Sequence, residues 1–362
     1  MTTNMADVLS GANVKELMGA IFPNSTFIPM TTLCCDPYKS KVDVVASLYI
    51  FTSLLSILGT GSIISCSLWN KIANSSEVHP LFHLALANFL LALTWFVGGI
   101  AWVSKSKMNC FYVEVFGEMF LIMSFFLTVN YGINVYIRLR GKTHNLEHLN
   151  FSTVSTSNLY KWLFRGLYIA SWVIPVITVA PLIYKYKQQR EEMKEEPSCS
   201  RCLLLFDRPN LRNQEGGVAW AMYDSILMII CLVPSILLLI VLYIMTERIH
   251  RKCLRRRGIH TDSQRKSMSN MRKRIILYIM VFIFCWTPAL IVAIMEVARK
   301  LKTKDSDWEL SCRTYIMQSV SAPLQGFLNS IVYGWTRKSF RRATRSRNDA
   351  AQRDYGSMLP IT

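Results

Sequence analysis

The sequence predicts an all-α membrane protein, a seven-transmembrane helix bundle with a short amphipathic helix after the last span. Of its 362 residues, 51% are apolar and the mean hydropathy is +0.26, values more typical of a membrane protein than of a soluble one. Seven apolar stretches each reach the roughly 20 residues needed to cross about 30 Å of hydrocarbon. Prolines inside several of these stretches indicate kinked helices that enclose a cavity.

The seven predicted spans follow one another along the chain without repeats. They cover about 43–69, 80–103, 111–137, 162–184, 218–245, 275–298 and 313–335. The third and seventh are the least hydrophobic, because the third carries Glu114 and Glu118 and the seventh carries Gln318 and Gln325.

Basic loops predict the orientation of the chain in the membrane. The loop 247–274 holds eleven Lys and Arg residues and only two acidic ones, and loops of this kind stay in the cytoplasm. We therefore expect an extracellular N-terminus at 1–42, a transmembrane domain at 43–336 and a cytoplasmic tail at 337–362. The net charge of +18 is then mostly a topology signal, so we expect a lipid bilayer and no nucleic acid as its partner. The plasma membrane is the favoured location.

The segment before the first span shows no signal peptide, since it lacks a basic start followed by a continuous apolar region. The first span is therefore expected to act as the signal anchor and to place the N-terminus outside. On that side Asn24 opens an Asn-Ser-Thr glycosylation sequon.

Cysteines are unusually common in the segments predicted to lie outside. There are six, an even number for an oxidising compartment: Cys34, Cys35, Cys110, Cys199, Cys202 and Cys312. The C-x-x-C spacing of Cys199 and Cys202 also fits metal or redox chemistry, but no second pair or histidine lies near it in the sequence, and disulfide use is favoured.

The sixth span holds the most informative pattern, F-x-x-C-W-x-P, formed by Phe282, Cys285, Trp286 and Pro288. Proline removes one backbone hydrogen bond and kinks a helix. In lipid that defect persists only where neighbours satisfy the freed carbonyl. Trp286 stands half a turn before the kink, and the pattern resembles the sixth helix of rhodopsin-like G-protein-coupled receptors.

The seventh span carries Pro323 and then Asn329 and Tyr333, which are four residues apart and share one helix face. This N-x-x-x-Y spacing resembles the N-P-x-x-Y pattern of the same receptors, with Ser330 in the proline slot. Beyond it, Phe340 stands among basic residues in a segment that resembles the short interfacial helix of such receptors; a basic flank that stops transfer is the alternative interpretation.

Three polar residues inside other spans are expected to meet Asn329 in a polar core. They are Thr60, Asn88 and Ser124. Polar groups at membrane depth tend to be functional; the alternative is plain interhelical hydrogen bonding, worth about 0.6 kcal/mol each. Asn88 is neutral where many members of the resembled family carry the carboxylate that binds sodium, so we expect no cofactor here.

The string from Pro323 to Trp335 resembles the orphan receptor-like transmembrane protein 116 family and the cyclic-AMP-receptor-like group. The resemblance implies an unidentified extracellular ligand, a heterotrimeric G protein as partner, and a disulfide from Cys110 to Cys199 or Cys202. One departure is clear. The acidic-Arg-Tyr triplet that ends the third span in the superfamily is Asn134-Val135-Tyr136 here.

Candidate ligand contacts are polar groups near the outer ends of the spans: Glu114, Glu118, Asp224, Glu296 and Gln318. Glu114 and Glu118 share a helix face at i,i+4, and together with Trp286 these groups would favour a cationic ligand. The alternative is that they pair with bases at the rim, and the sequence leaves both open.

Other function classes lack their signatures. The seventh span contains no lysine for a retinal Schiff base, and the chain shows no paired halves of a transporter. His79 and His83 have metal-compatible spacing but no Glu between them in an H-E-x-x-H pattern, so we expect neither a metal site nor an enzyme. The alternatives to a receptor are a non-signalling membrane scaffold and a transporter-like seven-helix protein.

Overall fold

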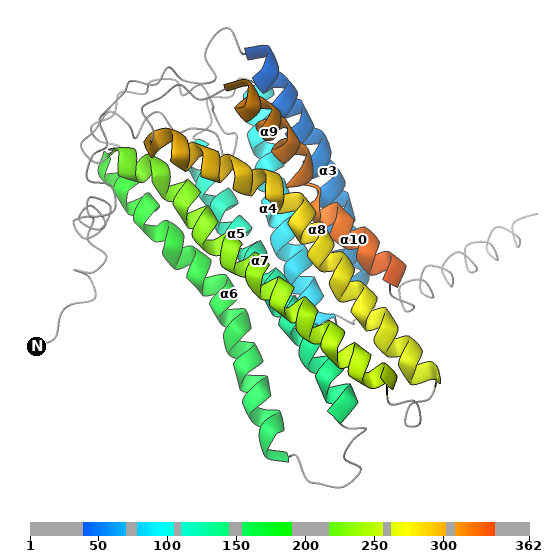
Figure 1. The fold of residues 1–362 in the computed structure, drawn as a ribbon. Coiled ribbons are helices and arrows are strands. Elements are labelled where there is room, and N and C mark those ends of the chain that lie inside the picture. The colour runs from blue at the N-terminus through cyan, green and yellow to red at the C-terminus, as the bar shows by residue number, and fades with distance from the viewer. Residues whose placement is uncertain are drawn as a thin grey trace, which may run out of the picture.

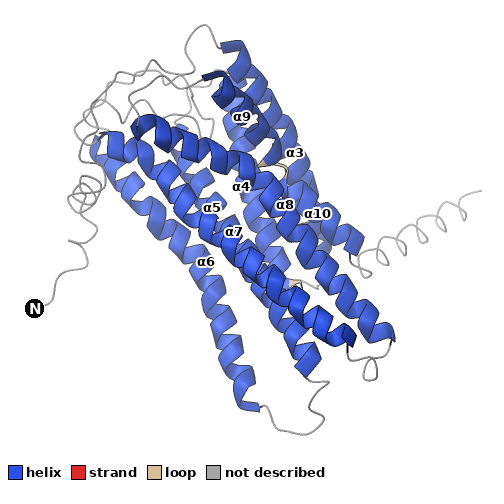
Figure 2. Ribbon diagram, viewed as in Figure 1, coloured by secondary structure: helices blue, strands red, loops and turns tan. Residues whose placement is uncertain are grey.

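A computed structural model describes residues 39–69, 78–104, 110–144, 154–189, 217–255, 262–301 and 308–336. Every element in these stretches is a helix (Figures 1 and 2): α3 (Lys39–Trp69), α4 (His79–Val103), α5 (Cys110–His144), α6 (Val154–Gln189), α7 (Gly217–Arg255), α8 (Asp262–Leu301), α9 (Trp308–Ser321) and α10 (Gln325–Thr336). The predicted all-α class is confirmed.

Six of these helices are long and apolar enough to cross a membrane. Their spanning parts are Asp43–Trp69, His79–Val103, Tyr112–Ile137, Arg165–Tyr184, Ser225–Ile249 and Ile275–Ala298. The first six predicted spans match them to within a few residues at most ends, and by seven at the start of the fifth. The third span is among the six despite its two glutamates, because their neighbours in Phe, Leu, Ile and Met keep its mean hydropathy at 1.6.

The predicted seventh span differs from the structure, since the helix expected over 313–335 is broken into α9 and α10 at Ala322–Leu324. Pro323 explains the break, because proline has no N–H to donate to the carbonyl of Ser319 four residues earlier. Thr52 Oγ1 of α3 lies 3.0 Å from that carbonyl and 2.7 Å from the Leu48 carbonyl of its own helix, so its one proton is shared between the two. A neighbouring helix thus compensates the defect, as a low-dielectric environment requires.

Three further prolines lie inside continuous helices, and a hydroxyl donates to the carbonyl three residues before each of them. The bonded carbonyls are Cys285 from Ser321 (3.1 Å) before Pro288, Thr178 from Tyr223 (2.7 Å) before Pro181, and Cys231 from Ser235 (2.7 Å) before Pro234. The hydroxyls near Pro288 and Pro181 come from another helix, so tertiary contacts lie beside these two prolines.

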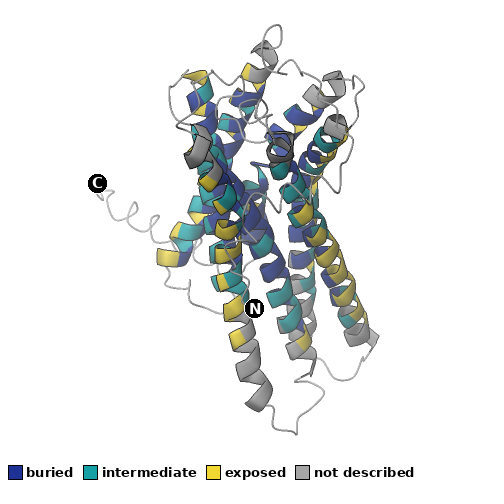
Figure 3. Cartoon of the chain, turned by 90° about the vertical axis from the view of Figure 1, so that its left-hand side faces the viewer, coloured by how far each residue is buried: buried dark blue, intermediate teal, exposed yellow. Residues whose placement is uncertain are grey.

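The helices close into a ring in the order α3, α4, α5, α7, α8 and then α9 with α10, which return to α3. Helix α6 stands outside this ring and packs on α5, at the left edge of the molecule in Figure 1. Buried residues line the inside of the bundle and exposed apolar ones face outward (Figure 3). This is the arrangement expected of a helix bundle whose outer surface faces lipid.

Helix α10 is held against α3 by glycines. A Cβ atom built on Gly326 of α10 would lie 2.2 Å from Ser56 Oγ and 2.6 Å from Thr60 Cγ2, and one built on Gly59 of α3 would lie 2.7 Å from Ser330 Oγ. Small residues allow this close approach of backbones, a recurrent device between helices in membranes.

Several sequence predictions fall outside the described part of the chain. They are the segments 1–38 and 337–362 with the sequon at Asn24 and the interfacial helix at Phe340, and also Cys199 and Cys202. Cys110 begins α5, but its side chain and that of Asp224 are not described. The disulfide and the glycosylation remain predictions.

Candidate functional site

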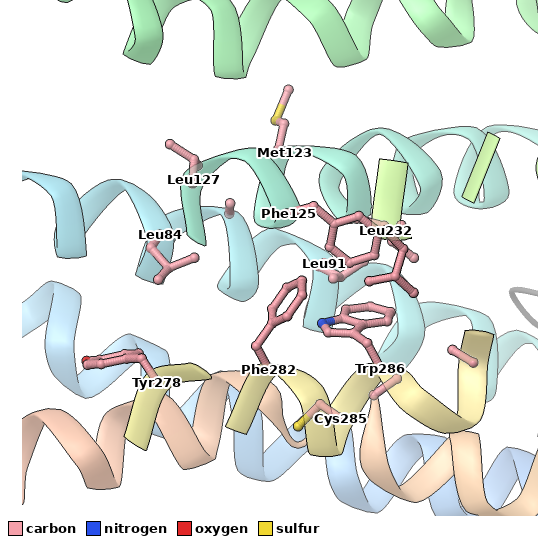
Figure 4. Packing of buried hydrophobic residues seen from close by; sticks show 14 of the residues in the cluster. Leu84, Leu91, Met123, Phe125, Leu127, Leu232, Tyr278, Phe282, Cys285 and Trp286 are labelled. Atoms are coloured by element: carbon pink, nitrogen blue, oxygen red, sulfur yellow. The ribbon is translucent and has the colours of Figure 1, made fainter. Parts of the chain in front are cut away.

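Trp286 occupies the centre of the bundle and is fully buried. It lies one helical turn after Phe282 on α8, so both rings point to the same side (Figure 4). The Phe125 ring of α5 meets Trp286 edge to face, with centroids 4.7 Å apart and planes at 87°. Trp95 of α4 approaches from another side, with its centroid at 6.2 Å. Edge-to-face pairs contribute about 0.5–1.5 kcal/mol beyond burial, so Trp286 joins three helices.

The indole N–H of Trp286 donates a hydrogen bond to Gln325 Oε1 at 2.9 Å. Gln325 is the first residue of α10, directly after the break at Pro323. An indole nitrogen can only donate, so the amide oxygen of Gln325 must face it. This bond connects the kinked part of α8 to the start of α10.

A central hydrogen-bond chain extends from this contact to two more helices, through Trp286, Gln325, Ser124 and Asn88. Ser124 Oγ of α5 lies 2.7 Å from Asn88 Oδ1 of α4 and 3.4 Å from Gln325 Oε1. Its one proton serves only one of the two oxygens at a time, so the longer contact between Ser124 and Gln325 is the weakest link of the chain. The amide nitrogens of Asn88 and Gln325 have no hydrogen-bond partner among the described residues. Buried donors of this kind cost free energy until they are paired.

The structure brings together two members of the predicted polar core and leaves two apart. Asn88 and Ser124 share a hydrogen bond, whereas the hydroxyl of Thr60 donates to the Ser56 carbonyl of its own helix at 2.6 Å. Thr60 instead packs its methyl group against α10 at Gly326. Asn329 contributes its main-chain carbonyl, which accepts from Tyr278 Oη at 3.4 Å.

Gln325 takes the place that the sequence analysis assigned to Asn329. In the sequence it stood out only as a residue that weakened the hydropathy of its span. The signal that identifies it is its position: an amide two residues after a proline, inside an apolar stretch, is costly unless it is used.

A second buried aromatic contact between α8 and α5 lies nearer the beginning of α8. The rings of Tyr278 and Tyr131 of α5 lie 4.6 Å apart at 55°, and Tyr333 of α10 is buried in the same core. Val135, which stands where the superfamily has arginine, is 8% exposed and packs in this core as an apolar residue. The third helix therefore carries no charge at that position.

The predicted ligand contacts lie on different helix pairs. Gln318 Nε2 of α9 donates to Tyr49 Oη of α3 at 3.4 Å, while Glu296 Oε2 of α8 accepts from Ser225 Oγ of α7 at 3.2 Å. Glu118 of α5 is buried and Glu114 is half-buried. These hydrogen bonds place Gln318 at the α3–α9 contact and Glu296 at the α7–α8 contact.

An ion pair joins α7 and α8 at the end predicted to be cytoplasmic. Arg272 Nε lies 2.8 Å from Glu247 Oε2, and Arg251 Nε, from the same helix as Glu247, lies 3.0 Å from Glu247 Oε1. The sequence analysis counted Glu247 only as a counter-charge in a basic loop. Its interhelical role depends on the ends of α7 and α8 lying side by side at the edge of their spans, which loop composition did not reveal.

Comparison with known families identifies the family of this chain. The model of the family described as transmembrane protein 116 matches residues 42–361. The chain belongs to the transmembrane protein 116 family. The match begins within the first turns of α3 and covers every other described helix, so the matched range spans the residues of both the central hydrogen-bond chain and the α7–α8 ion pair. Together with the apolar helices, membership establishes an integral membrane protein.

Proposed function

We propose that this member of the family is a receptor-like protein with seven transmembrane helices, which carries a signal from an extracellular ligand to a cytoplasmic G protein. The observation that supports it most is the hydrogen bond from Trp286 to Gln325. It links two proline sites, the kink at Pro288 and the break at Pro323, within one buried contact. No nucleophile and base stand beside it, and movement is therefore a more economical role than catalysis.

The proposal includes α9 and α10 as one broken seventh crossing. Together they cover residues 308–336, and at 1.5 Å per residue about 40 Å of helix is enough to cross about 30 Å of hydrocarbon. Both halves pack on α3 and α8, as two parts of one crossing would. Seven crossings place the basic segment 247–274 and the tail in the cytoplasm and the N-terminus outside, at the plasma membrane.

The proposed mechanism is a shift between two packings of α8. A ligand that favours one packing moves the equilibrium by its difference in affinity for the two. Rotation of Trp286 breaks its bond to Gln325 and its edge contact with Phe125. The segment of α8 that precedes Pro288 then changes its angle, and the Arg272–Glu247 pair at the start of that segment opens. The ligand is unidentified, and a G protein is the partner that the resemblance implies.

One observation favours a second function, a non-signalling membrane scaffold. Val135 stands in place of the arginine that many receptors use at the cytoplasmic end of the third span, and it is buried as an apolar residue. A scaffold needs the fold but no coupling to a G protein, so it does not require a charge at this position.

The test is a cell assay of basal second-messenger levels and G-protein recruitment, normalised to surface expression with an N-terminal tag. Trp286→Phe keeps an aromatic ring but removes the N–H, and we expect altered basal signalling at normal surface level. Trp162→Phe is the matched control, because Trp162 on α6 is 71% exposed. If the wild type and the Trp286 variants all stay at background with normal surface expression, the receptor proposal fails and the scaffold is favoured.

A further inference from the structure

Two histidines at the beginning of α4 face each other. His79 is the first residue of the helix and His83 lies one turn later; their Nε2 atoms are 3.3 Å apart, with ring centroids at 4.5 Å. Pro80 in the first turn restricts the backbone between them. The pair therefore has a geometry in which the two Nε2 atoms lie within hydrogen-bond distance of each other.

Aromatic side chains hold the two rings in place. Tyr168 of α6 lies across both, with centroid distances of 5.3 Å to His79 and 5.6 Å to His83. Trp172 of α6 and Phe82 of α4 each approach His83 edge to face at 5.9 Å. These contacts limit ring rotation, so little rotamer entropy remains to be lost when the nitrogens bind a third atom.

The distance between the two nitrogens fits a shared metal ion. A Zn–N bond of about 2.0–2.1 Å in a tetrahedral site places two ligand nitrogens roughly 3.3 Å apart. A hydrogen bond between the rings would be satisfied best at about 2.9–3.0 Å. Imidazole nitrogens are preferred ligands of Zn²⁺, Cu²⁺ and Ni²⁺. The sequence spacing was compatible with a metal, but the missing Glu of an H-E-x-x-H pattern argued against one, and the ring positions change that expectation.

We propose that His79 and His83 form a two-imidazole site for a transition-metal dication, with Zn²⁺ as the reference ion. No group of three or more His, Cys, Asp or Glu side chains suited to a metal occurs in the part of the chain that the structure describes, so water completes the coordination. Such a site binds weakly and responds to the metal concentration. Occupancy would fix the first turn of α4 against Tyr168 of α6, a helix outside the ring.

The experiment uses purified full-length protein in lipid nanodiscs. Zn²⁺ is titrated while the thermal unfolding temperature is recorded, and a chelator is added afterwards. We expect a rise that the chelator reverses. Cu²⁺ bound to the same protein should give an electron paramagnetic resonance spectrum with hyperfine coupling to two imidazole nitrogens.

Variants identify the ligands. His79→Ala and His83→Ala should each weaken the apparent Zn²⁺ affinity by at least about tenfold, the loss that even an outer-shell partner produces. The double variant should lose no more than either one, since a two-ligand site fails when either ligand is removed. His83→Gln fills the same space without a second imidazole, and its unfolding temperature without metal separates loss of binding from loss of folding. His250→Ala on α7 is the control and should keep the response.

Three results would overturn the proposal. They are the absence of any Zn²⁺ effect on the wild type at millimolar concentration, a response that survives in the double variant, and a response lost in His250→Ala. None of them bears on the receptor proposal, which rests on a different part of the bundle.

Discussion

The two sides of the bundle hold their helices in different ways. On one side α3 and α10 meet backbone to backbone at Gly59 and Gly326, where an added Cβ atom would overlap its neighbours at 2.7 Å or less. On the other side the ends of α7 and α8 that are predicted to be cytoplasmic are joined by the pair of Glu247 and Arg272, the latter with 31% of its side chain exposed. The first contact has no room to slide, and the second can open into solvent at small cost. This difference is the reason that the proposed switch assigns movement to α8 and not to α10.

The central hydrogen-bond chain lies between these two sides. Gln325 belongs to the fixed side through α10, and Trp286 belongs to the kinked helix α8. The bond between them therefore attaches the helix that the proposed switch would move to the helix held by the glycine contact. Each prediction below changes one side or the attachment, in order of decreasing expected effect.

Gly326→Ala should have the largest effect. Its Cβ would lie 2.2 Å from Ser56 Oγ and 2.6 Å from Thr60 Cγ2, separations that real Cβ atoms essentially never show, so α10 must shift away from α3 over its length. We expect a large loss of surface expression and a lower unfolding temperature. Gly166→Ala on α6 is the matched control, because nothing lies within 4 Å of its added Cβ, and alanine should be neutral or stabilising there. Equal behaviour of the two variants would contradict a sealed α3–α10 contact.

Trp286→Ala should follow, with a loss of about 3–5 kcal/mol for a fully buried aromatic. Trp286→Phe separates packing from hydrogen bonding. It retains a ring against Phe125 but leaves Gln325 Oε1 without its donor, and a buried acceptor left unpaired costs about 1–3 kcal/mol. Thermal unfolding in detergent or nanodiscs measures both. If Gln325→Leu combined with Trp286→Phe restored the wild-type stability, the cost would be assigned to the unpaired acceptor; a double variant less stable than either single one would argue against a direct bond.

The comparison also shows what the sequence could and could not predict. Six spans were predictable because an 18-residue apolar stretch has few other uses than crossing a membrane, and Trp286 with Pro288 was recognisable from its pattern. The break at Pro323 was not, because four other prolines are accommodated inside helices. Whether a proline kinks or breaks a helix depends on the partner of the freed carbonyl, here Thr52 from a helix almost 270 residues away.

Tertiary contacts explain the errors at the site in the same way. Thr60 and Asn329 are polar and lie in spans, but their rotation about the helix axis decides whether they meet Ser124, and hydropathy does not report rotation. The methyl group of Thr60 lies against Gly326 because α10 approaches so closely there. A pattern of small residues at 59 and 326 was visible in the sequence, but the sequence did not indicate that these two positions face each other.

Ser321→Ala tests the kink itself. Ser321 Oγ donates to the Cys285 carbonyl at 3.1 Å across α9 and α8, and a single hydrogen bond of this kind contributes about 0.5–1.5 kcal/mol. We expect a modest fall in unfolding temperature together with altered basal signalling, since the kink at Pro288 loses an external partner. Thr287→Ala on the exposed face of α8 is the control, because its hydroxyl bonds only within its own helix, to Ile283 at 2.6 Å. The same change in signalling from both variants would show that the α9 contact has no special role.

The smallest effect on stability is expected at the cytoplasmic ends, where two arginines share one glutamate. Arg272 reaches Glu247 from the neighbouring helix, whereas Arg251 reaches it from one turn away on the same helix and has 71% of its side chain exposed. Partly exposed ion pairs contribute about 0.2–1 kcal/mol, so Arg272→Ala should lower the unfolding temperature slightly and Arg251→Ala should leave it unchanged.

Distance measurements between spin labels on α7 and α8 provide the sharper readout. Arg272→Ala should broaden the distribution toward longer distances, and Arg251→Ala should not, because only an interhelical pair restrains the separation of two helices. Added salt should broaden the wild-type distribution and have little further effect on Arg272→Ala. A distribution that both variants change equally would assign the restraint to the total charge at this end, and the α7–α8 side would then be as fixed as the glycine contact between α3 and α10.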